Sequence, residues 1–128
     1  NSESIENEIF NFEKKFINLI NKADLCITRA GATSLAEISL LNKPFIAIPL
    51  PTAKDNHQSE NAKYYEQLGC CWILNQKNLN KDKLIIFLSN ILKERSDFNA
   101  KKSNLEKFNY KNSWNDINQK LKKILNEN

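Results

Sequence analysis

Short β-prone runs alternate with helix-like patterns through residues 1–92. The β-prone runs cover residues 25–28, 45–48 and 71–74. Between them, apolar side chains recur three or four residues apart, as they do along one face of a helix. Strands and helices in this order predict a parallel sheet covered by helices, with right-handed connections. We therefore predict an α/β fold with a Rossmann-like parallel sheet and flanking helices.

The segment before the first run predicts two further elements. Residues 9–12 form an apolar patch that fits a strand, and a helical face on Phe16, Ile17, Ile20 and Ala23 follows it. Further along, Gly69 is placed to end the helix before the third run as a left-handed cap.

The segment past residue 80 has a purely helical pattern. One helix is expected around 84–92, a second around 105–108 and a last one around 114–125. We expect residues 1–92 to form a partial α/β domain, and residues 93–128 to pack on it as C-terminal helices.

Composition excludes several classes of protein. The 128 residues are 41% hydrophobic and 27% charged, which is ordinary for one soluble domain. No apolar run approaches the ~20 residues that span a bilayer. The three cysteines, two of them adjacent, suit a reducing compartment. They lack the spacing of a zinc site, so we expect no metal. The chain contains no methionine, and we expect it to be part of a longer polypeptide.

The net charge of +4 is unevenly distributed. Residues 1–92 carry ten basic and ten acidic side chains, whereas residues 93–128 carry nine basic and five acidic ones. A basic C-terminal segment can contact nucleic acid or an anionic membrane, or it can simply be the solvated face of helices. We favour the solvated face and expect no nucleic-acid partner.

A polar loop follows the first β-prone run. Gly31 lets the backbone turn sharply there and approach a ligand closely. Ser34 and Glu37 have the spacing of a capping box, which would place Glu37 in the first turn of a helix. The N-terminus of a helix is a natural phosphate site, and a carboxylate beside it suits a ribose diol. Alternatively, Ser34 and Glu37 only cap each other.

The loop after the second run is stiffened by prolines and rich in hydrogen-bonding side chains. These are Asp55, Asn56, His57, Gln58 and Asn61. Such groups can recognise the hydroxyls of a sugar, and Gln58 and Asn61 share one helical face. Alternatively, the loop is only capped, by Asp55 or Asn56. Since both loops leave neighbouring strands at the same sheet edge, the pair suits a nucleotide-sugar.

Three stretches in these loops and strands resemble a known family in order and spacing. They read ADLCITRAGATSLAE at 23–37, KPFIAIPLP at 43–51 and DNHQSENA at 55–62. Together they resemble the C-terminal domain of the MurG family, which belongs to the GT-B glycosyltransferases of family 28. The likeness runs from about Phe12 to about Leu92, and the tail beyond matches only in being helical and basic.

The resemblance implies an inverting transfer of N-acetylglucosamine from UDP-N-acetylglucosamine to lipid I, which makes lipid II for peptidoglycan. It implies a cytoplasmic enzyme, peripheral on the inner membrane, that uses no cofactor. The family's acceptor domain is absent from this chain, and the catalytic base would come from it. We therefore expect the chain alone to bind donor weakly and to transfer nothing.

The resemblance also implies which residues bind the donor. Backbone amides at the start of the helix would hold the diphosphate, Glu37 the ribose, and Gln58 with its neighbours the sugar. Main chain near Glu13 would lie beside the uracil. The full set is Glu13, Ala32, Thr33, Ser34, Leu35, Ala36, Glu37, His57, Gln58 and Asn61. His57 is the only histidine, but its place in the donor loop favours hydrogen bonding over general-base work.

Two alternatives remain open from the sequence. One is a GT-B donor domain that acts on another acceptor, such as a lipid-linked sugar or a glycolipid. The other is a non-catalytic module that binds anions. The proline-flanked stretch at 49–51 together with the polar run at 55–61 favours the peptidoglycan enzyme over the first alternative. The second is disfavoured because the basic tail has, besides two phenylalanines, only Tyr110 and Trp114 as aromatic residues.

Overall fold

The computed structural model describes residues 16–51 and 57–126, and its centre is a three-stranded parallel sheet. The strands are β1 (Cys26–Thr28), β2 (Phe45–Ala47) and β3 (Cys71–Ile73), in the order β1-β2-β3. In the register, Ile27 lies opposite Ile46, which lies opposite Trp72. The Rossmann-like prediction is confirmed, and the three strands agree with the β-prone runs to within one residue at either end.

Three helices cover one face of the sheet: α1 (Phe16–Lys22), α2 (Ala32–Leu40) and α3 (His57–Gln67). Their apolar stripes meet alternate residues of the strands in one core. Its buried members are Ile20, Ala30, Leu35, Ile38, Phe45, Ala47, Ala62 and Cys71. The 3.6-residue period of α2 places Leu35 and Ile38 on the same side, which explains why this helix packs there.

The opposite face is covered by α4 (Lys81–Lys93) and the start of α5 (Arg95–Asn126). Ile46 of β2 points to this side and packs with Ile91 and Phe98. Because β2 is buried on both faces, it is apolar at every position, as central parallel strands are. A short 3-10 helix, η2 (Gln76–Asn78), leads from β3 toward α4.

Gly69 ends α3 as the sequence predicts. Its φ is +73°, the left-handed region that glycine adopts without a Cβ penalty. The amide of Gly69 donates to the carbonyl of Glu66 at 2.9 Å, and that of Cys70 to Tyr65 at 3.0 Å. These two bonds define a Schellman motif, which satisfies the last carbonyls of α3 and directs the chain into β3.

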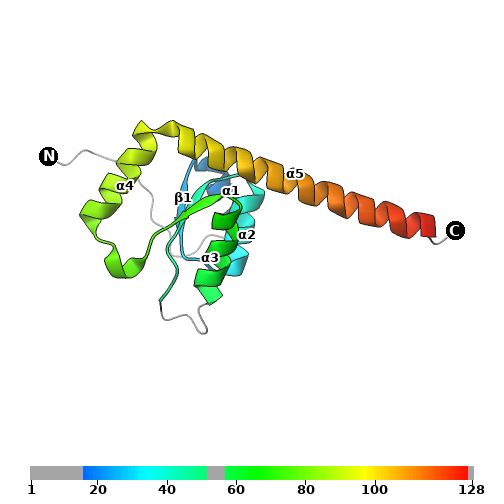
Figure 1. Cartoon of the computed structure of the whole chain (residues 1–128), viewed down its shortest axis with the longest axis horizontal. Coiled ribbons are helices and arrows are strands. Elements are labelled where there is room, and N and C mark those ends of the chain that lie inside the picture. The colour runs from blue at the N-terminus through cyan, green and yellow to red at the C-terminus, as the bar shows by residue number, and fades with distance from the viewer. Residues whose placement is uncertain (1–15, 52–56, 127–128) are drawn as a thin grey trace.

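The C-terminal segment differs from the prediction. The two helices expected around 105–108 and 114–125 are one continuous helix, α5. Leu105 is fully buried, and Asn104 donates to the carbonyl of Gly69 at 3.0 Å, so the first half is held against the domain. The second half projects away from the sheet and helices (Figure 1). Its apolar side chains are exposed: Tyr110, Trp114, Ile117, Leu121, Ile124 and Leu125.

Three predictions fall outside the described residues. They are the strand at 9–12, the placement of Glu13 beside a uracil, and the capping of the second loop by Asp55 or Asn56. Within the described ranges, no helix combines the length and apolarity needed to cross a bilayer.

Candidate functional site

The candidate site lies at the carboxyl edge of the sheet, where α2 begins. Its N-cap is Gly31, with φ −66° and ψ 139°, and the first helical bond runs from the amide of Leu35 to the carbonyl of Gly31. The amides of Ala32, Thr33 and Ser34 therefore stand in the first turn, where a helix offers them no carbonyl. Among the described residues, no side chain caps this turn. The arrangement presents N–H donors and the positive end of the helix dipole.

The capping box expected for this turn was wrong. Ser34 is the third residue of α2 rather than its cap, so there is no capping box and Glu37 stands in the second turn. Gly31 does not adopt a conformation reserved for glycine, since its φ is negative. A Cβ there would meet nothing within 4 Å, which leaves the space above the turn open.

The structure brings Gln58 and Asn61 of α3 against the loop that leads into α2. Gln58 Oε1 accepts from the amide of Ala30 at 3.1 Å and from the amide of Leu50 at 2.8 Å. Asn61 Nδ2 donates to the carbonyl of Ala30 at 3.0 Å. The prediction that Gln58 and Asn61 share one helical face is confirmed, but in this structure both side chains hydrogen-bond to backbone groups of the two loops.

Arg29 also ties the two exit loops together. Its Nη1 donates to the carbonyl of Ile48 at 3.3 Å, and the amide of Ile48 donates to the carbonyl of Thr28 at 2.8 Å. The guanidinium is exposed, so it lies at the rim of the site.

The remaining predicted residues lie on α2 and at the start of α3. The side chain of Leu35 is fully buried in the core and its amide donates to the carbonyl of Gly31, whereas Ala36 is exposed. Glu37 is half-buried on α2, and His57 is exposed as the first residue of α3. A cavity of about 220 Å³ separates the start of α2 from α3 and is lined by Ala32, Glu60, Asn61, Tyr64 and Tyr65. Two members of the predicted set, Ala32 and Asn61, therefore face a common space.

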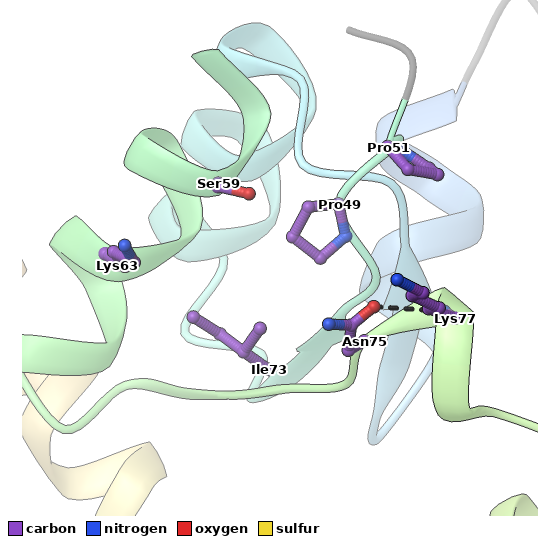
Figure 2. A pocket seen from close by; sticks show the side chains of 7 residues that line it. All are labelled: Pro49, Pro51, Ser59, Lys63, Ile73, Asn75 and Lys77. Carbon is purple, nitrogen blue, oxygen red and sulfur yellow. Dashed lines mark hydrogen bonds between the residues drawn. The ribbon is translucent and has the colours of Figure 1, made fainter. Parts of the chain in front are cut away.

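A second cavity at the same sheet edge was missed by the sequence analysis. It measures about 410 Å³ and lies between α3, the loop after β2 and the loop after β3 (Figure 2). Its lining includes Ser59 and Lys63 of α3 and Asn75 and Lys77 after β3. The sequence could have indicated this cavity, because ligands of parallel sheets bind outside the carboxyl ends of the strands, and this applies to the third strand as much as to the first two.

The cysteines are structural. Burial raises the pKa of the Cys71 thiol to about 12, and its Sγ donates to the carbonyl of Ala62 at 3.8 Å. Burial also raises the pKa values of Cys26 and Cys70. Across residues 16–51 and 57–126, no three side chains of the metal-ligating types gather.

A parallel sheet with helices on both faces, and with a helix N-terminus at its carboxyl edge that no described side chain caps, defines a Rossmann-like α/β domain. Residues 1–121 match the glycosyltransferase family 28 C-terminal domain. The chain belongs to this family.

Curated relatives agree with that assignment. A protein of Pelagibacter ubique strain HTCC1062 is 50% identical over 125 residues, which cover 98% of this chain and 35% of the relative. One from Wolbachia pipientis of Culex pipiens is 37% identical, covering 87% and 33%. Both carry the name UDP-N-acetylglucosamine--N-acetylmuramyl-(pentapeptide) pyrophosphoryl-undecaprenol N-acetylglucosamine transferase.

A solved structure shows the same fold. The crystal structure of Acinetobacter baumannii MurG superposes with a TM-score of 0.63 at 28% identity, covering 76% of this chain and 28% of that one. The chain spans about a third of the length of the curated relatives described above.

Proposed function

We propose that this chain binds UDP-N-acetylglucosamine and forms the donor-binding part of an inverting glycosyltransferase that converts lipid I to lipid II. The observation that carries the proposal is the uncapped first turn of α2 at the carboxyl edge of the sheet. Membership of family 28 and the shared name of the relatives support this donor and acceptor over another GT-B reaction or an anion-binding module.

The chemistry follows from where negative charge develops. A muramyl 4-hydroxyl attacks the anomeric carbon while UDP leaves from the opposite face, so charge accumulates on the departing diphosphate. The amides of Ala32, Thr33 and Ser34 are fixed dipoles that stabilise such charge without reorganising. We propose that these amides, rather than a cofactor, do this, and that Glu37 accepts from the ribose hydroxyls.

The proton acceptor for the attacking hydroxyl belongs to polypeptide outside this chain in this proposal. His57 opens α3 beside Gln58, on the side of the site that we assign to the donor sugar. It is therefore assigned to hydrogen bonding with the donor rather than to proton abstraction.

The test is an NMR titration of the ¹⁵N-labelled chain with UDP-N-acetylglucosamine, UDP-glucose and UMP. We expect shifts at Ala32, Thr33 and Ser34, larger for the N-acetyl sugar, and their loss in Glu37→Ala. Glu106→Ala, which removes an exposed carboxylate from α5, should leave the titration unchanged. A folded chain with no shifts at millimolar ligand would contradict the proposal.

We also propose that exposed lysines of α5 contact an anionic membrane at the cytoplasmic surface. Lys102, Lys122 and Lys123 are exposed on this helix. Lys101 of the same helix does not belong to this set, because its ammonium pairs with Asp97 at 3.0 Å and lies over the ring of Trp72. Sedimentation with anionic vesicles at low salt, and its loss at high salt or with neutral vesicles, is the expected result. Failure to sediment at low salt would end the idea.

A further inference from the structure

Ala30 connects β1 to α2 and has both of its backbone polar groups buried. Its exposure is 0%, although β1 ends at Thr28 and α2 begins only at Ala32. The N–H and C=O of Ala30 therefore have no hydrogen-bond partner within a strand pair or a helix, and buried backbone groups require partners. Both partners come from α3: the Gln58 oxygen binds the Ala30 N–H, and the Asn61 nitrogen binds the Ala30 carbonyl.

The orientation of each carboxamide follows from the chemistry of its partners. Gln58 lies between two backbone N–H groups, those of Ala30 and Leu50, so the atom between them must be the acceptor oxygen. Asn61 faces a carbonyl, so it must present its NH₂ group. Both lone pairs of the Gln58 oxygen are thereby used. Toward any ligand, Gln58 retains only its Nε2 donor.

This arrangement links three segments through one side chain. The Gln58 oxygen bonds the exit loop of β1 and the exit loop of β2 to the first turn of α3. Ala30 is followed directly by Gly31, the N-cap of α2, so fixing the Ala30 peptide fixes where the next amides point. Displacing the loop after β2 would therefore move the amides that face the phosphate.

We propose that Gln58 and Asn61 are positioning residues that hold the first turn of α2 in its phosphate-facing orientation, and that Gln58 meets bound donor only as a hydrogen-bond donor. The proposal rests on the proposed function for the identity of the ligand. In this proposal α3 contributes to diphosphate binding without itself contacting the phosphate.

The first arm of the test uses the ligand-free chain and amide hydrogen exchange. In Gln58→Leu, the amides of Ala30 and Leu50 lose their acceptor and should exchange at least tenfold faster. In Gln58→Glu, a carboxylate oxygen replaces the amide oxygen, so both amides should stay protected. Gln67→Leu is the matched control, because Gln67 is exposed at the other end of α3. Unchanged exchange at Ala30 in Gln58→Leu would overturn the inference.

The second arm separates positioning from direct contact with the sugar. UDP carries the diphosphate but no N-acetylglucosamine, so a residue that only touches the sugar cannot change UDP binding. Gln58→Leu and Asn61→Leu should each weaken UDP binding about 3- to 10-fold, with Gln67→Leu unchanged. Gln58→Glu should reduce the preference for UDP-N-acetylglucosamine over UDP, because it removes the one donor that Gln58 has left for the sugar.

The outcomes distinguish the two proposals. UDP affinity that is unaffected by Gln58→Leu and Asn61→Leu, in chains whose other amide shifts are native, would overturn positioning and leave the donor site standing. If the unsubstituted chain does not bind UDP, both the proposed function and the claim that Gln58 and Asn61 affect phosphate binding are overturned. The exchange results at Ala30 and Leu50 would still decide whether the carboxamides hold the two loops.

Discussion

Alanine at position 69 should destabilise the chain by about 2–3 kcal/mol. Gly69 has a φ of +73°, and a residue with a Cβ pays roughly 1–2 kcal/mol in that region. The new Cβ would also lie 2.6 Å from Asn104 Nδ2, closer than any real contact. Asn104 would have to move and give up its 3.0 Å bond to the Gly69 carbonyl, which costs about 1 kcal/mol more.

Urea unfolding followed by tryptophan fluorescence measures this loss, since Trp72 packs against Phe87 between β3 and α4. The chain has only two glycines, and the other provides the control. Gly31 has a φ of −66° and open space around its missing Cβ, so Gly31→Ala should change stability by less than about 0.5 kcal/mol. Equal losses in the two variants would refute the reasoning.

A double-mutant cycle separates the two causes. Asn104→Ala removes the side chain that the new Cβ would strike, together with its hydrogen bond to Gly69. In that background, Gly69→Ala should cost only the backbone penalty of roughly 1–2 kcal/mol. A cost in the Asn104→Ala background as large as in the native chain would show that the steric contact contributes nothing.

Three further results are expected. Leu105→Ala should lose about 2–4 kcal/mol in urea unfolding because Leu105 is fully buried, whereas Leu121→Ala on the same helix should lose less than about 0.5 because Leu121 is half exposed. Cys71, with its pKa raised to about 12, should resist alkylation at pH 8 until the chain is unfolded. The hydrogen bonds that Asp97 accepts from Lys101 and Trp72 lower the pKa of its carboxyl in the folded chain. The charged Asp97 should therefore stabilise the fold slightly, and in full at any pH above the pKa that Asp97 has in the unfolded chain. This stabilisation should disappear as the pH falls through the lower folded pKa, and Asp97→Asn should remove this step from a plot of unfolding midpoint against pH.

Local patterns were enough to predict the sheet. Each strand is a short apolar run, and β2 is apolar throughout because both of its faces are covered. Gly69 could be assigned as a cap because the run of helical periodicity stops just before it. These features depend on neighbours in sequence, so a single sequence contains them.

Two C-terminal helices were predicted where the structure has one, because the apolar side chains of α5 lie on one side of the helix in its first half and on another side in its second half. Phe98 and Leu105 are seven residues apart and pack on the domain. The exposed series from Tyr110 to Ile124 follows a different phase, at 110, 114, 117, 121 and 124. A change of phase resembles a new helix, but residues 95–126 contain neither glycine nor proline to break the first one. The absence of a breaker was the more informative signal.

The polar face of α3 shows why a binding site is harder to predict than a fold. Gln58 and Asn61 carry the donors and acceptors that a sugar requires, and those groups equally suit a buried peptide. Which use they serve depends on whether an unpaired backbone group lies within reach, and that follows from the burial of Ala30 some thirty residues earlier. Because the Gln58 oxygen is fully used, its remaining donor can serve a ligand only while the loops stay in place. Gln58 can therefore contribute to the site only while it also stabilises the two loops. We expect that replacing it changes the stability of the chain and its affinity for the donor together.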